Sequence, residues 1–426
     1  MERLQKSMRL DGLHPGLFFI ALIIWAVLFI SLTLGLLWTI WSVIRQPVPT
    51  GQTATWNFRF DLAKLTAMTA VLGAVVALPF TVIRLRLLNE QSETAKDALF
   101  NDKINAASRD LGARRTVTRR LREVSYSLDE TDYIVQEIRG EPISLPVDDQ
   151  EITYGPWTFI GEEEDDLVTR AAAIDRLEGL AKERRDEAPR IARMLSIYVR
   201  ELSREFPARN HPRIEWKKLT DPFFGRPSMG EDEAFQHLKL RPDDVSLTSL
   251  ESWAHDLNPT RPDMEKAAQT LGRLKTIPGV SAHEIEIDLR EANLQGFDLR
   301  GLMFSEARLI GARMEGADLG WARMEGANLG GAQMEGANLG GAQFSEETKF
   351  QPATLRGAGW YFVDLTTIPH AAEYFHETFG DGTVILPDGV ENPPAHWDKE
   401  KLEWDDFNTK WRDFQQSIGY TPPDQS

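Results

Sequence analysis

The sequence contains no cysteine among its 426 residues. Disulfide bonds, thiol catalysis and thiolate metal sites are therefore excluded. Its 8 histidines are scattered, and no HExxH, nucleophile-elbow or zinc-ligand spacing occurs. Basic residues are the minority, with 48 Lys and Arg against 65 Asp and Glu and a net charge of -17, which argues against direct nucleic-acid binding. We expect no catalytic site, no cofactor and no metal.

Charge is also missing from two long segments near the N-terminus. The run from Leu17 to Ile44 carries no charged residue and would be about 42 Å long as a helix. A second charge-free run extends from Leu65 to Ile83, with Pro79 near its end. Both are long enough for a hydrocarbon core of ~30 Å, so we expect transmembrane helices at 17–44 and 65–83. Without an ionisable residue inside them, they offer no proton or ion pathway.

Flanking charges favour one orientation of this expected hairpin in the lipid bilayer. Arg3, Lys6 and Arg9 precede the first segment, while Arg84 and Arg86 follow the second. Positive charge accumulates on the cytosolic side of membrane proteins. We therefore expect a cytosolic N-terminus at 1–16, an external connector at 45–64, and a cytosolic body from 84 onward.

The segment 84–275 is expected to be a mainly helical cytosolic region. It begins with "RLRLLNEQSETAKDALFNDKINAASRDLG", which predicts a helix that continues from the second apolar segment. A weak heptad stripe runs along this helix and consists of Leu85, Leu88, Ala95, Leu99 and Ala106. The stripe indicates packing on helices of the same chain or self-association, so homo-oligomer formation stays open.

Five arginines then cluster in an otherwise acidic chain, at Arg114, Arg115, Arg119, Arg120 and Arg122. A basic cluster near a membrane can bind anionic lipid headgroups, at about 1 kcal/mol per residue. The alternative is a helix face that is paired with nearby carboxylates. The acidic run "GEEEDD" at 161–166 is interpreted as a solvated helix start, because negative charge is favoured at helix N-termini.

Two helices follow and are expected to form a hairpin that resembles one HEAT-like unit. They are "DLVTRAAAIDRLEGLAKERR" and "DEAPRIARMLSIYVRELS". A third helix, "RPDMEKAAQTLGRL", has Asp263 as its expected N-cap and Gly272 as its expected stop. No role follows from the turn-rich segment 205–260.

A strict period of five occupies residues 283–365, and it matches neither an α-helix nor a strand. Alanine stands two places before most of the large apolar residues, whereas Ile287, Phe297, Leu302 and Val363 take that place in four of the units. The sixteen large residues, predicted to point inward, are Leu289, Leu294, Leu299, Phe304, Leu309, Met314, Leu319, Met324, Leu329, Met334, Leu339, Phe344, Phe350, Leu355, Trp360 and Leu365. One extra residue in "SEETKF" shifts the register once.

The units "ADLGW", "ANLGG" and "ANLGG" resemble the A(D/N)Lxx signature of the pentapeptide-repeat family. This resemblance implies a right-handed quadrilateral β-helix in which four pentapeptides form one coil. The fold class expected is thus multidomain: a transmembrane helical hairpin, a helical cytosolic region, and a short β-helix of about 20 Å. A C-terminal tail follows at 366–426.

Residues twenty apart stack on one wall of such a solenoid. Met314 and Met334 then point inward with Glu315 and Glu335 outside, and Glu325 lies on the opposite wall. Trp321 stands on a glycine wall, where it aligns with Gly301 and Gly341. We interpret Trp321 and the three glutamates as candidate partner contacts, with packing of Trp321 against its own chain as the alternative.

The order of segments, including "LLNEQSETAKDAL", "RAAAIDRLEGLA" and "MEKAAQTLGRL", is similar to membrane-anchored pentapeptide-repeat proteins of bacteria. Relative to that group, about 115–166 and 205–260 are insertions. The group implies no enzymatic activity. We expect a scaffold in the bacterial inner membrane that presents its β-helix to an unknown cytosolic protein. The alternatives are a DNA-mimicking regulator of a topoisomerase, as soluble family members suggest, and an enzyme with a site in the inserted segments.

Overall fold

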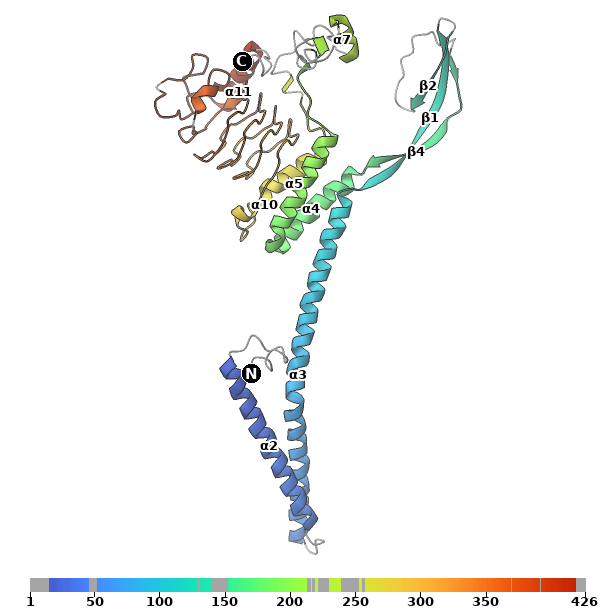
Figure 1. Cartoon of the computed structure of the whole chain (residues 1–426), viewed down its shortest axis with the longest axis vertical. Helices are drawn as coiled ribbons and strands as arrows, with labels where there is room; N and C mark the ends of the chain where they lie inside the picture. The colour runs from blue at the N-terminus through green and yellow to red at the C-terminus, as the bar shows by residue number, and fades with distance from the viewer. Residues whose placement is uncertain are drawn as a thin grey trace. The chain divides into compact units, whose positions relative to one another are not determined.

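The computed structural model describes residues 15–45, 52–128, 131–138, 152–212, 216, 219–220, 230–238, 253–254, 257–368, 370–390 and 392–418. The chain divides into two compact units, Met1–Lys103 and Ile104–Ser426. The first unit is built from long helices, and the second combines a sheet, a layer of helices and a solenoid (Figure 1).

The two long helices of the first unit lie side by side (Figure 1). They are α2 (Pro15–Arg45) and α3 (Gln52–Asp110). The indole Nε1 of Trp25 donates a hydrogen bond of 2.8 Å to the backbone carbonyl of Val75. The helices also approach closely at Gly35, where an added Cβ would lie 2.6 Å from Cε of Met68. The predicted helical continuation beyond residue 84 is confirmed, because α3 ends only at Asp110.

A four-stranded antiparallel sheet occupies the segment of the arginine cluster. It consists of β1 (Arg114–Leu128), β2 (Thr131–Ile138), β3 (Ile152–Tyr154) and β4 (Thr158–Asp165). Strand β1 pairs with each of the other three. The helical interpretation of the arginine cluster is therefore wrong. Thr116, Val117 and Thr118 among the arginines are β-branched, which favours a strand.

The acidic run "GEEEDD" is likewise a strand rather than a helix start over most of its length. Residues Gly161 to Asp165 belong to β4 and pair with β1. Only Asp166 caps the following helix, since its side chain accepts a hydrogen bond of 3.1 Å from the backbone N–H of Thr169.

The predicted helical pair is confirmed as α4 (Leu167–Glu183) and α5 (Ala188–Glu205), joined by the short helix η2 (Arg185–Glu187). Helix α10 (Pro262–Leu274) packs against both. Two details of α10 differ from expectation. Arg261 rather than Asp263 is its N-cap, and Gly272 lies inside it. A Cβ at Gly272 would lie 2.7 Å from Cβ of Leu302, so this glycine permits close packing instead of ending the helix.

The repeats form a quadrilateral solenoid, as the sequence predicts. Parallel bridges join residues twenty apart, for example Asp288 to Arg308 and Arg308 to Asn328. After the extra residue they join residues twenty-one apart, as in Asn328 to Lys349. All of the large residues predicted to point inward are buried except Phe344, which is half-buried next to the extra residue. Four pentapeptides therefore close each coil.

The N-terminal end of the solenoid is closed by the helical layer. Ser203 of α5 accepts a hydrogen bond of 2.9 Å from the backbone N–H of Asn293 in the first coil. Glu265 of α10 accepts a hydrogen bond of 2.8 Å from the backbone N–H of Asp298. Gln269 of α10 donates one of 2.9 Å to the backbone carbonyl of the same residue. These groups are the ones that a preceding coil would use, so this end is protected against stacking on another chain.

The C-terminal tail continues the solenoid past Leu365. Strand β5 (Gly359–Trp360) pairs in parallel with β6 (Phe379–Gly380), and Asp364 forms a bridge to Ile385. Helix α11 (Trp404–Ile418) then packs on the side of the coils, where Trp411 donates to the carbonyl of Gly357 at 2.8 Å. Shorter elements complete the described chain: α7 (Glu231–Leu238), η4 (Ala282–Glu284) and η5 (Ala371–Tyr374).

Candidate interaction surface of the repeat domain

Glu315 and Glu335 are buried, which corrects the prediction that they point outward as partner contacts. Their exposed fractions are 1% and 4%. They stack in adjacent coils, since the N–H of Gly316 bonds the carbonyl of Glu335 at 2.9 Å. The wall is covered by distant parts of the chain: a Cβ at Gly316 would lie 2.3 Å from the carbonyl oxygen of Ala254. The five-residue period placed these glutamates correctly on one wall but could not show that the wall is covered.

The two stacked glutamates share an unusual electrostatic environment. Oε1 of Glu315 accepts a hydrogen bond of 2.6 Å from Arg313, whereas Oε2 of each glutamate lacks a hydrogen-bond partner among the described residues. Burial, together with the neighbouring charge of Glu315, raises the pKa of Glu335 to about 8. Burial also raises the pKa of Glu315, although Arg313 opposes this effect, so the stacked pair favours the retention of a proton.

Glu325 lies on the opposite wall, as predicted, but it is engaged by its own coil neighbours. Its carboxylate accepts hydrogen bonds from Ser305 at 2.6 Å and from Arg323 at 3.0 Å. Burial acts to raise the pKa of Glu325, but these bonds outweigh it and lower the pKa. Of the three predicted glutamate contacts, Glu325 alone retains substantial exposure, and its charge is already paired.

Trp321 differs from the glutamates, because 60% of its surface is exposed. Its backbone has a φ of 60°, the left-handed conformation that glycine adopts at the equivalent corner of the next coil. The ring lies over that glycine: a Cβ at Gly341 would be only 2.4 Å from Cδ2 of Trp321. Part of one ring face is thus supported by the solenoid, and the rest of the ring is accessible.

Phe362 occupies the same corner one coil beyond Gly341 and was not singled out from the sequence. It also has a left-handed φ, 53°, and an exposed fraction of 52%. The carbonyl of Tyr361 accepts a hydrogen bond of 2.6 Å from the N–H of Gly341, so Tyr361 lies in the coil adjacent to Gly341. Phe362 is the next residue after Tyr361. We call Trp321, Gly341 and Phe362 the aromatic corner. Two exposed aromatic rings at successive positions of one corner, with Gly341 covered by the ring of Trp321 between them, form a surface suited to a protein contact.

A polar strip lies on the same wall as the aromatic corner. Asn338 donates a hydrogen bond of 2.9 Å to Asp318 across adjacent coils, and burial raises the pKa of Asp318. Both residues line a cavity of about 230 Å³ that is bordered by Trp404 and Arg412 of α11. The cavity lies between the solenoid and α11, and the residues of the aromatic corner do not line it.

The five clustered arginines lie on β1, and most of them are ion-paired with carboxylates of neighbouring strands. Their partners are Asp165 and Glu163 for Arg114, Glu164 for Arg115, Glu162 and Glu164 for Arg119, and Glu137 for Arg122. The guanidinium of Arg120 lies 4.9 Å from the ring centroid of Phe159. The predicted pairing with nearby carboxylates therefore holds, although it occurs across strands instead of along a helix.

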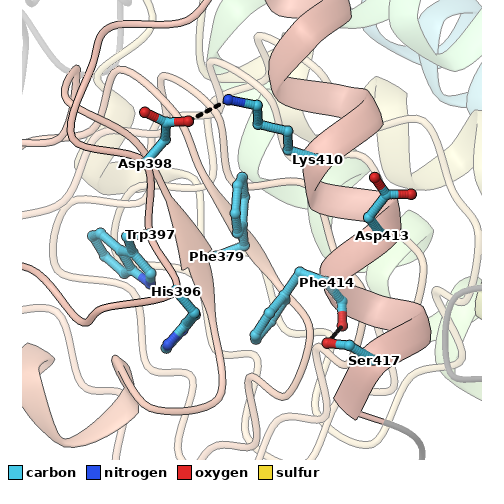
Figure 2. A pocket seen from close by; sticks show the side chains of 8 residues that line it. All are labelled: Phe379, His396, Trp397, Asp398, Lys410, Asp413, Phe414 and Ser417. Atoms are coloured by element: carbon cyan, nitrogen blue, oxygen red, sulfur yellow. Dashed lines mark hydrogen bonds and ion pairs between the residues drawn. The ribbon is translucent and has the colours of Figure 1, made fainter.

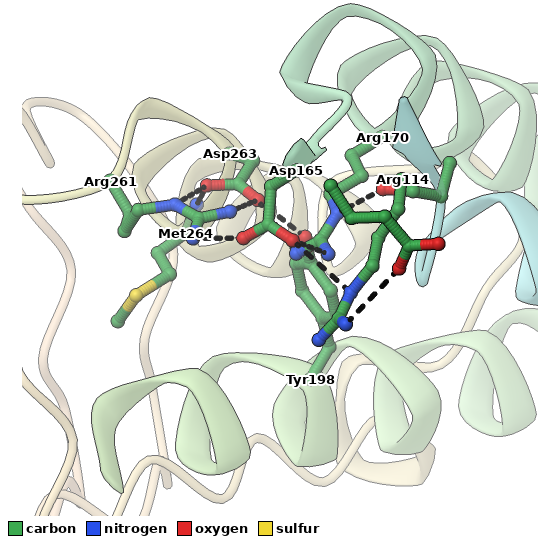
Figure 3. A network of polar contacts seen from close by, with 9 residues as sticks. Arg114, Asp165, Arg170, Tyr198, Arg261, Asp263 and Met264 are labelled. Atoms are coloured by element: carbon green, nitrogen blue, oxygen red, sulfur yellow. Dashed lines mark hydrogen bonds and ion pairs between the residues drawn. The ribbon is translucent and has the colours of Figure 1, made fainter. Parts of the chain in front are cut away.

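A buried polar network connects this sheet to the helical layer (Figure 3). Arg261 bonds Asp263 at 3.0 Å and Asp165 at 2.6 Å, and Tyr198 donates to Asp263 at 2.6 Å. Arg170 pairs with Asp165 from the other side. Burial acts to raise the pKa of Asp263, but the bonds from Arg261 and Tyr198 keep it below its usual value. The groups satisfy one another, which fits a structural role.

A second cavity, of about 380 Å³, lies between α11 and the part of the C-terminal tail that precedes it (Figure 2). The ring of His396 stacks on Phe414 at 4.8 Å, and its Nε2 lies 2.8 Å from the carbonyl of Thr378. Asp398 forms an ion pair with Lys410. The polar groups named here bond one another or the backbone. Within the described ranges, no group of three His, Cys, Asp or Glu side chains is arranged to hold a metal ion.

Comparison with known proteins agrees with the geometry of the solenoid. Residues 285–320 and 312–346 match the family model described as pentapeptide repeats, with 8 copies. Together with the twenty-residue bridges, this match defines the domain as a pentapeptide-repeat β-helix of the right-handed quadrilateral type. A search of curated proteins gives no match.

Several solved structures are similar to part of this chain. One is a pentapeptide repeat protein from the Arabidopsis thaliana thylakoid lumen, with 28% identity over 25% of this chain and 72% of that one, and a TM-score of 0.19. Another is a pentapeptide repeat protein from the cyanobacterium Cyanothece. It has 27% identity over 24% of this chain and 64% of that one, with a TM-score of 0.16. A third is QnrB1, a plasmid-mediated fluoroquinolone resistance protein. It has 17% identity over 32% of this chain and 65% of that one, with a TM-score of 0.11.

Proposed function

We propose that this protein is a non-enzymatic scaffold, tethered to a membrane by α2 and α3, that presents the aromatic corner to a cytosolic partner protein. The observation that carries the proposal is the 60% exposure of Trp321 at a left-handed corner. The solenoid closes equally well with glycine there, as it does at Gly301 and Gly341. A large ring in a conformation that costs about 1 kcal/mol is more useful for binding than for folding.

The proposed tether rests on the apolar surface of the first unit. Phe19–Arg45 and Trp56–Asp110 are long and apolar enough to cross a membrane, and the most apolar windows of both are unburied. Exposed side chains such as Val27, Leu34 and Phe80 would be covered by lipid. The positive charges at both outer flanks favour both termini in the cytosol, and the resemblance of the sequence favours the inner membrane of a bacterium.

Regulation of a topoisomerase by DNA mimicry is less well supported. Such a surface needs rows of free carboxylates that imitate phosphates. Glu315 and Glu335 are buried instead, and Glu325 is bonded to Arg323. We expect no effect of the protein on gyrase supercoiling, and inhibition or protection in that assay would revive this alternative. Metabolite-induced thermal shifts would likewise support an enzyme whose site lies in the inserted segments.

The proposal is tested by crosslinking in membranes that contain the full chain. Wild type is compared with Trp321→Ala and with Ile310→Ala, which removes an apolar side chain of 41% exposure from another wall. We expect one protein to be crosslinked by wild type and Ile310→Ala and to be lost with Trp321→Ala. Equal recovery from all three, or no specific partner from any, contradicts the aromatic corner as the contact.

A further inference from the structure

The aromatic corner is continuous with a further exposed ring at the start of α11. The centroid of the Tyr361 ring lies 4.7 Å from that of Phe362 and 5.5 Å from that of Trp404. Tyr361 is half-buried, whereas 41% of the surface of Trp404 is exposed. Trp321, Phe362, Tyr361 and Trp404 therefore form one aromatic surface that extends from the solenoid to α11, and we call it the aromatic band.

The rings of the aromatic band are held by the backbone of the solenoid and of the tail. The N–H of Phe362 donates a hydrogen bond of 2.8 Å to Oγ1 of Thr383, and the hydroxyl of Tyr361 donates one of 3.0 Å to the carbonyl of Leu402. The ring of Trp321 rests on the neighbouring coil at Gly341. A surface that is fixed before binding loses little conformational entropy when a partner docks on it.

Free carboxylates flank the band where it reaches α11. Three of the four residues from Glu403 to Asp406 are acidic, and all three are exposed. Among the described residues, the side chains of Glu403, Asp405 and Asp406 form no hydrogen bond or ion pair. Burial raises the pKa of Tyr361, and the negative charges of Asp381 and Glu403 add to this effect, so Glu403 lies close to the band.

The neighbouring cations do not neutralise this acidic rim. Lys401 supplies one charge against three. Arg300, on the wall beside Trp321, is already engaged, because it bonds Asp298 at 2.6 Å and lies 3.5 Å from Asp318. The aromatic band therefore combines accessible ring faces with an excess of negative charge.

We propose that the aromatic band binds an arginine-containing basic segment of the partner protein. The inference rests on the proposed function, since it takes the aromatic corner as the partner contact. A guanidinium is planar, stacks on aromatic faces and pairs with carboxylates, whereas a lysine ammonium is a compact and strongly hydrated charge. Arginine makes such contacts within this chain: the guanidinium of Arg122 lies 4.0 Å from the ring centroid of Tyr154 and 4.7 Å from that of Trp157.

The proposal is tested with two fluorescein-labelled peptides of equal charge, nona-arginine and nona-lysine. The full chain is placed in phosphatidylcholine nanodiscs, whose lipid has no net charge, and binding is followed by fluorescence anisotropy at about 0.15 M salt. One variant, Trp321→Ala, removes a ring. A second removes the rim by combining Glu403→Gln, Asp405→Asn and Asp406→Asn.

Each of these variants has a matched control. Ile310→Ala removes an exposed apolar side chain from another wall. A triple variant removes three exposed carboxylates from the N-terminal end of the solenoid by combining Glu284→Gln, Glu286→Gln and Glu291→Gln. Thermal melts of all variants confirm that they are folded before binding is compared.

We expect wild type to bind the arginine peptide about fivefold more tightly than the lysine peptide, because only arginine stacks well on the rings. Trp321→Ala and the rim variant should each weaken binding of the arginine peptide about fivefold, and the two controls should leave it unchanged. Equal affinity for the two peptides, no effect of Trp321→Ala, or equal weakening by both triple variants overturns the proposal. Absence of binding by wild type also overturns it.

Failure of this inference and failure of the proposed function are distinguished by the crosslinking experiment in membranes. A partner that is captured by wild type and lost with Trp321→Ala, without binding of the arginine peptide, refutes only the basic segment. Equal capture by wild type and Trp321→Ala refutes the aromatic corner as the contact, and the inference that rests on it.

Discussion

Trp25 of α2 supplies the hydrogen bond that the backbone carbonyl of Val75 in α3 would otherwise lack. In a regular helix this carbonyl accepts from the N–H four residues later, but residue 79 is proline and has no N–H. The Trp25 indole donates to the carbonyl at 2.8 Å. A free carbonyl inside an apolar medium costs roughly 1–3 kcal/mol, so the pair stabilises the contact between the two helices.

Replacement of Trp25 by Phe should destabilise the pair of helices by about 1–2 kcal/mol, because the Val75 carbonyl loses its donor. Unfolding of the full chain in mixed micelles with increasing SDS, followed by circular dichroism, measures this loss. The matched control is the same substitution in a Pro79→Ala background, where the restored N–H can bond Val75. There, Trp25→Phe should cost much less, and equal losses in both backgrounds would refute the relationship.

Stability of the repeat domain should fall as the pH rises from about 5 to 8. The pKa of Glu335 is raised from 4.5 to about 8 in the fold, so the folded state holds a proton that the unfolded chain releases. The resulting stabilisation is complete below pH 4.5 and is lost as the pH approaches 8. Thermal melts of Glu335→Gln should show a flatter pH profile than wild type and a higher melting temperature at pH 8.

Glu325→Gln provides the control for this pH dependence, because the pKa of Glu325 is lowered and its carboxylate stays charged between pH 5 and 8. Its melting profile should run parallel to that of wild type across this range. A Glu335→Gln profile that also runs parallel to wild type would mean that Glu335 is charged in the fold.

Leu329→Lys should unfold the solenoid. Leu329 is completely buried, and the narrow apolar coil offers a lysine ammonium no partner or water. Gln343→Lys introduces the same charge at an exposed position of the solenoid and should leave the melt nearly unchanged. A Leu329→Lys melt within a few degrees of wild type would contradict the inward assignment.

Trp321→Gly should be more stable than Trp321→Ala by about 1 kcal/mol. Both variants remove the ring, but only glycine relieves the left-handed φ of 60° at this corner. The Trp321→Ala melt should stay close to that of wild type, because the ring is largely exposed. Comparison of the two melts tests the backbone strain, and identical values would mean that this corner relaxes without glycine.

Replacement of the five clustered arginines by Gln should weaken the sheet without changing the binding of the protein to anionic vesicles. Their ion pairs with the neighbouring strands already neutralise most of the cluster. Cosedimentation of the body without its helical hairpin, once shown to be folded, measures vesicle binding. A marked loss of binding in the variant would support the lipid-headgroup interpretation.

Local signals accounted for the elements that the sequence predicted correctly. The helix through residue 110, the pair α4 and α5, and the solenoid each follow from a periodicity that is repeated over many residues. The sheet was missed because the arginines of β1 and the glutamates of β4 each resemble a solvated helix when considered alone. Only their antiparallel pairing, such as Arg115 with Glu164, shows that two oppositely charged runs of similar length belong together.

The sequence by itself determined the coil of four pentapeptides, because a strict five-residue period with one large inward residue per unit, and in most units an alanine two places before it, allows few other packings. It also placed Trp321 on a glycine wall. Tertiary structure decided which walls are free. Glu315 and Glu335 are buried because Ala254 and α11, which are distant in sequence, cover their wall, whereas Trp321 and Phe362 stay exposed. Coverage of a wall depends on long-range contacts, and these leave no periodic signal in the repeats.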